Sequence, residues 1–246
     1  MNLSPMKLIR RIVNRGDRRC SAVIVAAGSS RRMKGVDKLY VELGGKPLLA
    51  RTLQAFDECD LISEIVLVVS ADKRGTAARL CSDYPVAKLS SIVTGGATRA
   101  ESSNIGLRAV SKRSDLIAIH DGARPLVTQQ IIKDAIESAS LSGSGVPARP
   151  VSSTLKRVKS GTVVEAVDRN CVYEIQTPQV FQADLIRSAL KSAEGCGCEI
   201  TDESSAAERA GVPIHITPGA PDNIKITTPE DLEFAELILK GRGELV

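Results

Sequence analysis

The fold class is decided by one continuous stretch, Ala22-Val23-Ile24-Val25-Ala26-Ala27-Gly28-Ser29-Ser30-Arg31-Arg32-Met33. It begins with an uninterrupted apolar run, which is typical of a strand covered by helices on both faces. A turn of small residues follows, where backbone N–H groups can approach phosphates closely. Arg31 and Arg32, with Lys38 further on, would supply positive charge there. The turn matches neither the Walker loop nor the dinucleotide-binding glycine pattern, so its cations favour polyphosphate binding of another kind.

The alternation of short β-branched runs and longer helical patterns continues along the chain. Strands are predicted at residues 22–25, 65–69, 89–93 and 116–119, and helices at 47–56, 76–81, 100–110, 129–139, 184–193, 203–210 and 229–239, with a short apolar run at 214–216. This order predicts an α/β, Rossmann-like fold with a mostly parallel, twisted sheet flanked by helices. Residues 154–158 and 163–167 flank Ser160-Gly161, which predicts a β-hairpin and a projecting arm at about 152–170.

Composition limits the classes of function. The 246 residues carry a formal net charge of +4, but six Lys or Arg residues and one Asp lie among the first 19, so the remainder is close to neutral. We expect a single domain over residues 21–246, preceded by a basic extension at 1–20. The charge run favours two interpretations of this extension, a disordered segment or a mis-assigned start. An organellar transit segment or an anion-binding arm is the alternative. No apolar stretch approaches about 18 residues, so we expect no membrane span and a cytoplasmic protein.

Few residues suit nucleic-acid stacking or a zinc site. The chain has three Phe, three Tyr and no Trp, which argues against nucleic acid as a partner. Two histidines and six scattered cysteines offer little for a multi-ligand metal cage, so any metal should be held by oxygen. Cys196 and Cys198 are interpreted as two free thiols in a loop rather than as a metal site.

Polar motifs follow the other predicted strands, where ligands collect in open α/β sheets. In Gly95-Gly96-Ala97-Thr98-Arg99-Ala100-Glu101-Ser102, backbone amides, a hydroxyl and a guanidinium converge near a helix N-terminus, which suits a base edge or an anion. A plain strand-to-helix turn is the alternative. In His120-Asp121-Gly122-Ala123-Arg124-Pro125, Asp121 could hold Mg²⁺ on triphosphate oxygens or cap a helix. His120 should point to the opposite strand face, as a hydrogen-bonded core residue rather than a base. Arg124, Arg169 and Lys225 could each be an ordinary surface cation.

The combined motifs resemble those of the 2-C-methyl-D-erythritol 4-phosphate cytidylyltransferases, from about residue 21 to 240. Besides the three stretches above, the chain has Val167-Asp168-Arg169-Asn170, Thr177-Pro178-Gln179, Thr201-Asp202-Glu203 and Asp222-Asn223-Ile224-Lys225 in matching order. The resemblance implies a homodimer joined through the hairpin arm, with CTP and methylerythritol phosphate as substrates and Mg²⁺ as cofactor. It implies catalytic roles for Arg32, Lys38 and Lys225; nucleotide binding by Ala26, Ala27, Gly28, Gly96, Arg99, Ser102 and Gly122; acceptor binding by Asp121, Arg124, Thr154, Arg169 and Thr201; and metal binding by Asp121.

The chemistry expected from this resemblance needs no side-chain nucleophile. An oxygen of the acceptor's phosphate attacks the α-phosphorus of CTP in line and pyrophosphate leaves, while positioned positive charge stabilises the transition state. Two positions depart from the family pattern. Asp37-Lys38-Leu39-Tyr40 stands where Pro-Lys-Gln before an aromatic residue is usual, and Ala97 stands where an acidic or polar residue is common.

Four other classes of protein compete with this interpretation. Ribitol 5-phosphate cytidylyltransferases share several motifs, but residues 154–157 and 167–170 favour the methylerythritol enzyme. A molybdopterin-type nucleotidyltransferase would share only the first loop. A non-catalytic nucleotide-binding module on the same fold would lose the cations around the phosphates, whereas this chain keeps them. A serine hydrolase would need G-x-S-x-G, which the sequence lacks.

Overall fold

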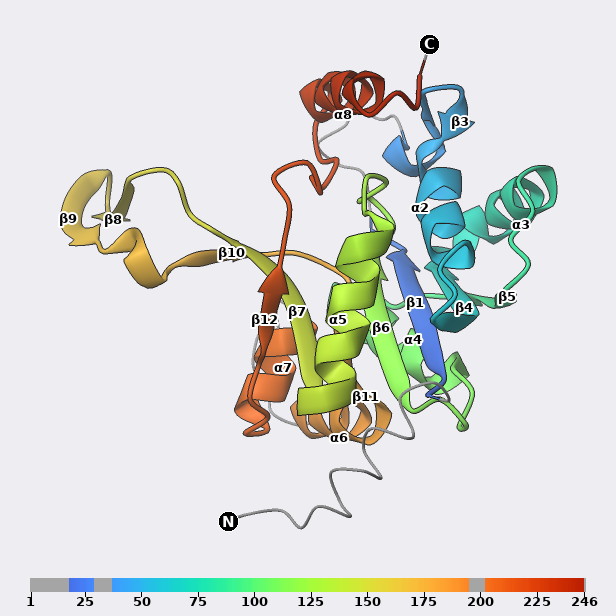
Figure 1. Cartoon of the computed structure of the whole chain (residues 1–246), viewed down its shortest axis with the longest axis horizontal. Helices are drawn as coiled ribbons and strands as arrows, with labels where there is room; N and C mark the ends of the chain where they lie inside the picture. The colour runs from blue at the N-terminus through green and yellow to red at the C-terminus, as the bar shows by residue number, and fades with distance from the viewer. Residues whose placement is uncertain (1–17, 29–36, 195–201, 246) are drawn as a thin grey trace.

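The computed structural model describes residues 18–28, 37–194 and 202–245 and is built around one eight-stranded sheet (Figure 1). The strands β1 (Cys20–Ala26), β4 (Ile62–Val69), β5 (Leu89–Thr94) and β6 (Leu116–Asp121) are mutually parallel in the order β6-β1-β4-β5. These are the four strands predicted from the sequence. The mostly parallel α/β sheet is therefore confirmed.

Four further strands complete the sheet on the β6 side. These are β7 (Ser144–Pro150), β10 (Tyr173–Ile175), β11 (Gln179–Gln182) and β12 (Ile216–Pro218). β11 pairs antiparallel with both β6 and β7, β10 pairs antiparallel with β7, and β12 runs parallel to β7. No strand was predicted at β7, because Gly145, Pro147 and Pro150 interrupt its apolar pattern.

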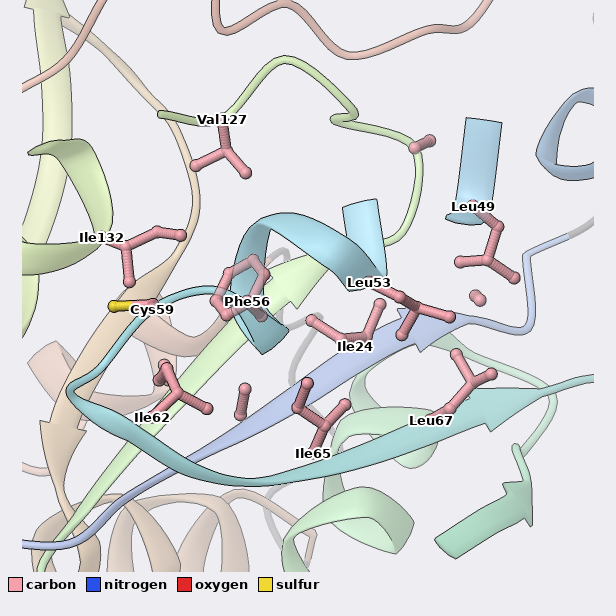
Figure 2. Packing of buried hydrophobic residues seen from close by; sticks show 14 of the residues in the cluster. Ile24, Leu49, Leu53, Phe56, Cys59, Ile62, Ile65, Leu67, Val127 and Ile132 are labelled. Carbon is pink, nitrogen blue, oxygen red and sulfur yellow. The ribbon is translucent and has the colours of Figure 1, made fainter. Parts of the chain in front are cut away.

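Helices cover both faces of the sheet because side chains alternate along each strand. In β1, Ala22 and Ile24 pack into a core with α2 (Leu48–Asp57), α5 (Gln129–Ser142) and residues of α3 (Arg74–Asp83) and α8 (Pro229–Gly241). Figure 2 shows Leu49, Leu53 and Phe56 of α2 against this face.

The opposite face of the sheet has its own core. Val23 of β1 packs there with residues of α6 (Ala183–Glu194), α7 (Glu203–Arg209) and Leu107 of α4 (Arg99–Ala109). Both cores are almost entirely aliphatic, as the scarcity of aromatic residues requires.

The expected hairpin forms outside the main sheet. β8 (Leu155–Lys159) and β9 (Thr162–Val167) pair only with each other and project from the body beyond β10 (Figure 1). Ser160 and Gly161 both have positive φ, 49° and 78°, which matches the tight turn predicted there. A short 3₁₀ turn, η5 (Arg169–Cys171), leads back toward the sheet.

The predicted helices all appear, with shifts at their ends. The helix expected from residue 47 begins at Leu48, because Pro47 belongs to a two-residue strand, β3 (Lys46–Pro47), paired with β2 (Glu42–Leu43). Two 3₁₀ turns, η3 (Lys38–Tyr40) and η4 (Ala71–Lys73), precede α2 and α3. Most of the basic extension lies outside the described residues, but Arg18 already donates from Nη1 to the carbonyl of Ser140 at 2.6 Å. Among the helices that the structure describes, none is long and apolar enough to span a membrane.

Candidate active site

A pocket of about 450 Å³ opens at the carboxyl ends of the parallel strands. Its lining comes from three segments that follow β1, β5 and β6, together with η3 and the loop before α8. Among the predicted site residues that line it are Ala26, Ala27, Gly28, Lys38, Gly96, Arg99, Ser102, Asp121 and Lys225. The topology therefore brings together residues separated by up to about 200 positions in the sequence, as expected for this fold.

The first loop forms one wall of this pocket. Ala26, Ala27 and Gly28 lie at the carboxyl end of β1, and a Cβ placed on Gly28 would meet no atom of the described residues within 4 Å. Gly122 lies behind this wall, since a Cβ there would meet Ala26 Cβ at 3.1 Å and the Val25 carbonyl at 3.2 Å. Gly122 thus lets the β6 turn pack closely against the first loop. Arg31 and Arg32 fall in the part of the chain that the structure leaves undescribed.

The glycine loop after β5 is held by its own side chains. Ser102 Oγ accepts from the Gly96 N–H at 3.2 Å and donates to the Thr98 carbonyl at 2.9 Å. The Ala97 N–H donates to Glu101 Oε2 at 2.7 Å, and Thr98 Oγ1 caps α4. A Cβ on Gly95 would lie 2.6 Å from Ala27 Cβ, so this glycine permits the close approach of two loops. The helix N-terminus expected here is confirmed.

Asp121 is the electrostatic centre of the pocket. Its carboxylate lies 3.1 Å from Arg99 Nε, 2.7 Å from Lys225 Nζ and 3.7 Å from Arg124 Nε. Burial alone would raise the pKa of Asp121, but Arg99, Lys225 and Arg124 together hold it well below its ordinary range. Asp121 ends β6 and precedes a turn, so it caps no helix. Of the two alternatives open from the sequence, the N-cap is excluded.

Arg99 joins this centre to a second buried acid. Its Nη1 lies 2.7 Å and 2.9 Å from the two carboxylate oxygens of Glu203, a residue at the start of α7 that is 1% exposed. Burial would lower the pKa of Arg99, but Glu203 and Asp121 raise it above its ordinary value. The sequence motif Thr201-Asp202-Glu203 pointed to this segment, yet no role was assigned to Glu203. An acid in the first turn of a helix is favourable in any case, so its presence there does not predict an ion pair with a distant arginine.

Two lysines reach the pocket from segments far apart in the chain. Lys38 donates from Nζ to the carbonyl of Ile226 at 2.6 Å, and Lys225 precedes that residue. Asn223 is fully buried, and its Nδ2 donates to Gln176 Oε1 and to the Thr177 carbonyl at 3.1 Å each. This amide fixes the loop that carries Lys225. The unusual Asp37 accepts from the Leu39 N–H at 3.3 Å and lies 3.3 Å from Lys73 Nζ.

The predicted acceptor-binding residues are spread over three places. Arg124 is largely buried beside Asp121, and its Nη1 donates to the Asn223 carbonyl at 2.6 Å. Thr154 is exposed at the root of the arm, and Arg169 is exposed in η5, where its Nη1 contacts the Ser152 carbonyl. Neither lines the pocket of its own chain. Thr201, like Cys196 and Cys198, belongs to the undescribed segment 195–201.

His120 is a core residue, as predicted. It is fully buried, and its ring centroid lies 4.8 Å from that of Phe56. Nε2 faces the Arg124 carbonyl at 3.2 Å and Nδ1 faces the Thr177 hydroxyl at 3.0 Å. Because a carbonyl only accepts, Nε2 carries the proton and Nδ1 accepts from Thr177. Burial lowers the pKa of His120 to about 3, so the ring is neutral at physiological pH.

The donor set suits a cation held mainly by substrate. Among the described residues no group of three or more His, Cys, Asp or Glu side chains forms a metal site. Asp121 is the one carboxylate among the described residues lining the pocket. A single carboxylate beside phosphate oxygens is a common arrangement for Mg²⁺, which usually keeps several waters. Asp121 is therefore the residue of the described lining that could ligate such an ion, and in this structure Lys225 and Arg99 contact its oxygens.

Comparison with known proteins agrees with this geometry. The family model for 2-C-methyl-D-erythritol 4-phosphate cytidylyltransferase matches residues 20–241. The chain is 43% identical over 220 residues to an enzyme of that name from Dehalococcoides mccartyi, covering 89% of this chain and 95% of the relative. It is 40% identical over 222 residues to one from Geobacillus thermodenitrificans, covering 90% and 97%.

Solved structures give the same result. The 4-diphosphocytidyl-2C-methyl-D-erythritol synthase of Anaerococcus prevotii superposes with a TM-score of 0.81 at 30% identity, covering 91% of this chain and 96% of that one. The 2-C-methyl-D-erythritol 4-phosphate cytidylyltransferase of Thermus thermophilus superposes with a TM-score of 0.73 at 29% identity, covering 89% and 98%. The chain therefore belongs to the 2-C-methyl-D-erythritol 4-phosphate cytidylyltransferase family, whose members are nucleotidyltransferase enzymes.

Proposed function

We propose that this protein transfers CMP from CTP to 2-C-methyl-D-erythritol 4-phosphate, giving 4-diphosphocytidyl-2-C-methyl-D-erythritol and pyrophosphate in the cytoplasmic, non-mevalonate route to isoprenoids. The observation that carries the proposal is the pocket at the strand ends, where Lys38, Arg99 and Lys225 converge beside the glycine loop. The relatives carry the name of this activity. Ser102 is the one serine among the described residues that line the pocket, and its Oγ is engaged in hydrogen bonds that hold the glycine loop. This agrees with a reaction that uses no side-chain nucleophile.

In the proposed reaction an oxygen of the acceptor's phosphate forms the new bond to the α-phosphorus of CTP. The bond from that phosphorus to the bridging oxygen of the β-phosphate breaks, and pyrophosphate leaves with the electron pair. Lys38 and Lys225, with Arg32, would neutralise the charge that builds up on the phosphate oxygens. The glycine loop would hold the cytidine, with Gly96 and Ser102 closest to it.

Mg²⁺ would enter this site with the triphosphate and neutralise part of its charge. Asp121 is the residue that would hold it, because it is the carboxylate available in the described lining. When CTP binds, Lys225 would exchange its contact with Asp121 for one with a phosphate oxygen. Removal of divalent cations with a chelator should therefore abolish turnover.

The acceptor site would be completed by a second copy of the chain. Thr154 and Arg169 lie on or beside the arm, away from the pocket of their own chain. Val158, Val163 and Val164 of the arm are 55%, 57% and 55% exposed, which is unusual for three neighbouring β-branched residues. A homodimer would cover these valines and bring the arm's polar residues to the partner's pocket.

The test is pyrophosphate release by purified protein with Mg²⁺, in which CTP, ATP, GTP and UTP are each combined with methylerythritol phosphate and with ribitol 5-phosphate. Release only with CTP and methylerythritol phosphate is expected. Pyrophosphate release with CTP and ribitol 5-phosphate would mean that the protein carries out the same transfer on a different acceptor. Binding of CTP without turnover on either acceptor would contradict the proposal and favour a non-catalytic module.

A further inference from the structure

Glu203 forms one end of a buried chain of charged groups beneath the pocket. Both of its carboxylate oxygens accept from Arg99 Nη1, and Oε1 also accepts from Ser103 Oγ at 2.6 Å. Arg99 in turn donates from Nε to Asp121 Oδ1 at 3.1 Å. Three elements, α7, α4 and β6, thus meet through a single guanidinium. Glu203 is not among the described residues that line the pocket, so its effect on substrate would pass through Arg99, which does line it, or through its hydrogen bond to Ser103 of α4.

The position of Glu203 is fixed independently of Arg99. Gln179 of β11 donates from Nε2 to Asp202 Oδ2 at 2.8 Å and accepts from the Ser204 N–H at 2.8 Å. Asp202 also caps α7 by accepting from the Ser205 N–H at 2.9 Å. Because the first turn of α7 is anchored to the sheet in this way, Glu203 is a rigid support for the guanidinium.

Glu203 adds a second negative charge beside a crowded carboxylate. Arg99, Lys225 and Arg124 all contact Asp121, so three positive charges share one carboxylate there. Glu203 takes the end of the Arg99 guanidinium that Asp121 does not contact. This leaves Asp121 Oδ2 for Lys225 at 2.7 Å and holds the start of α4, which carries Ser102, against β6.

We propose that Glu203 is a positioning residue for cytidylyl transfer, which acts through Arg99 to hold the glycine loop and Asp121 in register. The inference rests on the proposed function and extends it to a residue outside the pocket. Two opposite effects are expected from removing its charge. Glu203→Gln makes the site more positive by one charge, which by attraction alone would tighten CTP binding. Loss of positioning would instead weaken CTP binding and slow turnover. Whether KM for CTP falls or rises therefore distinguishes the effect of charge from the effect of positioning.

The experiment compares kcat and KM for both substrates in wild-type protein, Glu203→Gln and Glu64→Gln. We expect Glu203→Gln to lower kcat by roughly 10- to 100-fold and to raise KM for CTP, the size typical of a misplaced binding group. Glu64 is the matched control, because its Oε2 accepts from Ser21 Oγ at 2.6 Å at the opposite end of the strands. Its variant should stay within about twofold of wild type.

A double-mutant cycle with Arg99→Ala tests the route. If Glu203 acts through Arg99, the effect of Glu203→Gln should nearly vanish in the Arg99→Ala background. Equal effects in both backgrounds, or a Glu203→Gln protein with lower KM for CTP and unchanged kcat, would overturn the proposal. Should wild-type protein not turn over CTP, the proposed function fails. Calorimetric CTP affinity of the same variants then decides the positioning role separately.

A milder variant covers the case in which Glu203→Gln does not fold. Ser103→Ala removes one hydrogen bond to the carboxylate but keeps the charge and the ion pair. Its kcat should fall by about threefold or more, in the same direction as for Glu203→Gln. A folded Ser103→Ala protein with wild-type kcat and KM, beside an unfolded Glu203→Gln protein, would make Glu203 a folding element and contradict the proposal.

Discussion

Lys225 is held at the pocket by neighbouring residues. On the surface a lysine is a mobile point charge, but here its Nζ lies 2.7 Å from Asp121 and its loop is fixed by the buried amide of Asn223. A pre-positioned charge costs little reorganisation when negative charge develops in the transition state. In the proposed reaction Asp121 would hold Lys225 at the pocket before CTP binds, and the loop fixed by Asn223 would keep it there after a phosphate oxygen replaces Asp121 as its partner.

Replacement of Lys225 by alanine should lower kcat by roughly 100- to 1,000-fold, the range seen when one charge-stabilising group is removed. Steady-state pyrophosphate release measures it, and circular dichroism with thermal denaturation checks the fold. Lys191→Ala, an exposed cation of α6 outside the pocket, is the control and should retain wild-type turnover. Near-normal kcat in Lys225→Ala would refute the charge-stabilisation account.

His120 makes a prediction about stability rather than catalysis. Its folded pKa of about 3 lies below the unfolded value of about 6.5, so the unfolded chain binds more protons over the interval between them. The stabilisation is fully present above pH 6.5 and is lost as the pH falls toward 3, at up to about 1.4 kcal/mol per pH unit.

Urea unfolding of wild type and His120→Gln at several pH values measures this contribution. Between pH 7.5 and pH 5 the free energy of unfolding of wild type should fall by about 2 kcal/mol more than that of the variant. Parallel pH dependence in the two proteins would show that His120 does not titrate as a buried neutral ring. Because His120 stays neutral in the folded protein, the pH dependence of kcat should be the same in wild type and in His120→Gln.

At the scale of elements, the regular parts of the fold could be predicted and the irregular parts could not. β1, β4 and β6 are largely buried on both faces, so each is a mostly apolar run that stands out locally, whereas β5 at the sheet edge is only partly buried. β7 contains two prolines and is held by α5 and by its partner strands, which no local pattern reveals. The same holds for the candidate site, whose locally encoded parts could be predicted and whose long-range contacts could not. Strand-end motifs located the pocket, while the Glu203 ion pair depends on α7 packing beside α4 and had no periodic signal.

Gly106 controls how closely α4 approaches the sheet. A Cβ at this position would lie 2.3 Å from Val23 Cγ1 and 2.9 Å from Val68 Cγ2. Gly106→Ala should therefore push α4 outward despite its better helix propensity, and α4 carries Arg99 and Ser102 at its start. We expect a loss of about 1–3 kcal/mol in unfolding free energy and a higher KM for CTP.

Gly75 of α3 provides the matched control for this substitution. A Cβ there would meet no atom within 4 Å in the part of the chain that the structure describes, so Gly75→Ala should stabilise the protein by about 0.5–1 kcal/mol through helix propensity. Its KM for CTP should not change. Denaturant unfolding of both variants gives the free energies, and stabilisation by Gly106→Ala would contradict the close-approach argument.

At the scale of the whole molecule, the arm divides the proposed machinery between two places. The pocket lies at the strand ends of the main sheet, whereas Arg169 belongs to η5, which follows the β8-β9 hairpin. That hairpin projects from the body and pairs with no strand of the main sheet (Figure 1). In a single chain nothing covers the exposed valines of the arm among the described residues. In a symmetric dimer each arm would pack on the partner and reach the partner's pocket. Shared sites of this kind can be tested by mixing subunits that carry different lesions.

Co-expression of Lys225→Ala and Arg169→Ala chains should restore activity that neither variant has alone. In a mixed dimer one pocket receives both lesions, while the other combines a wild-type pocket with a wild-type arm and is intact. Random pairing makes half of the dimers mixed with one intact site of two, so about a quarter of wild-type turnover is expected. Mixing Lys225→Ala with Lys38→Ala is the control, because both lysines line one pocket and no mixed site is intact. No activity in the test pair despite dimers on sedimentation would show that Arg169 does not act across the interface. Activity in the control pair would show that Lys38 and Lys225 are not both required in one pocket.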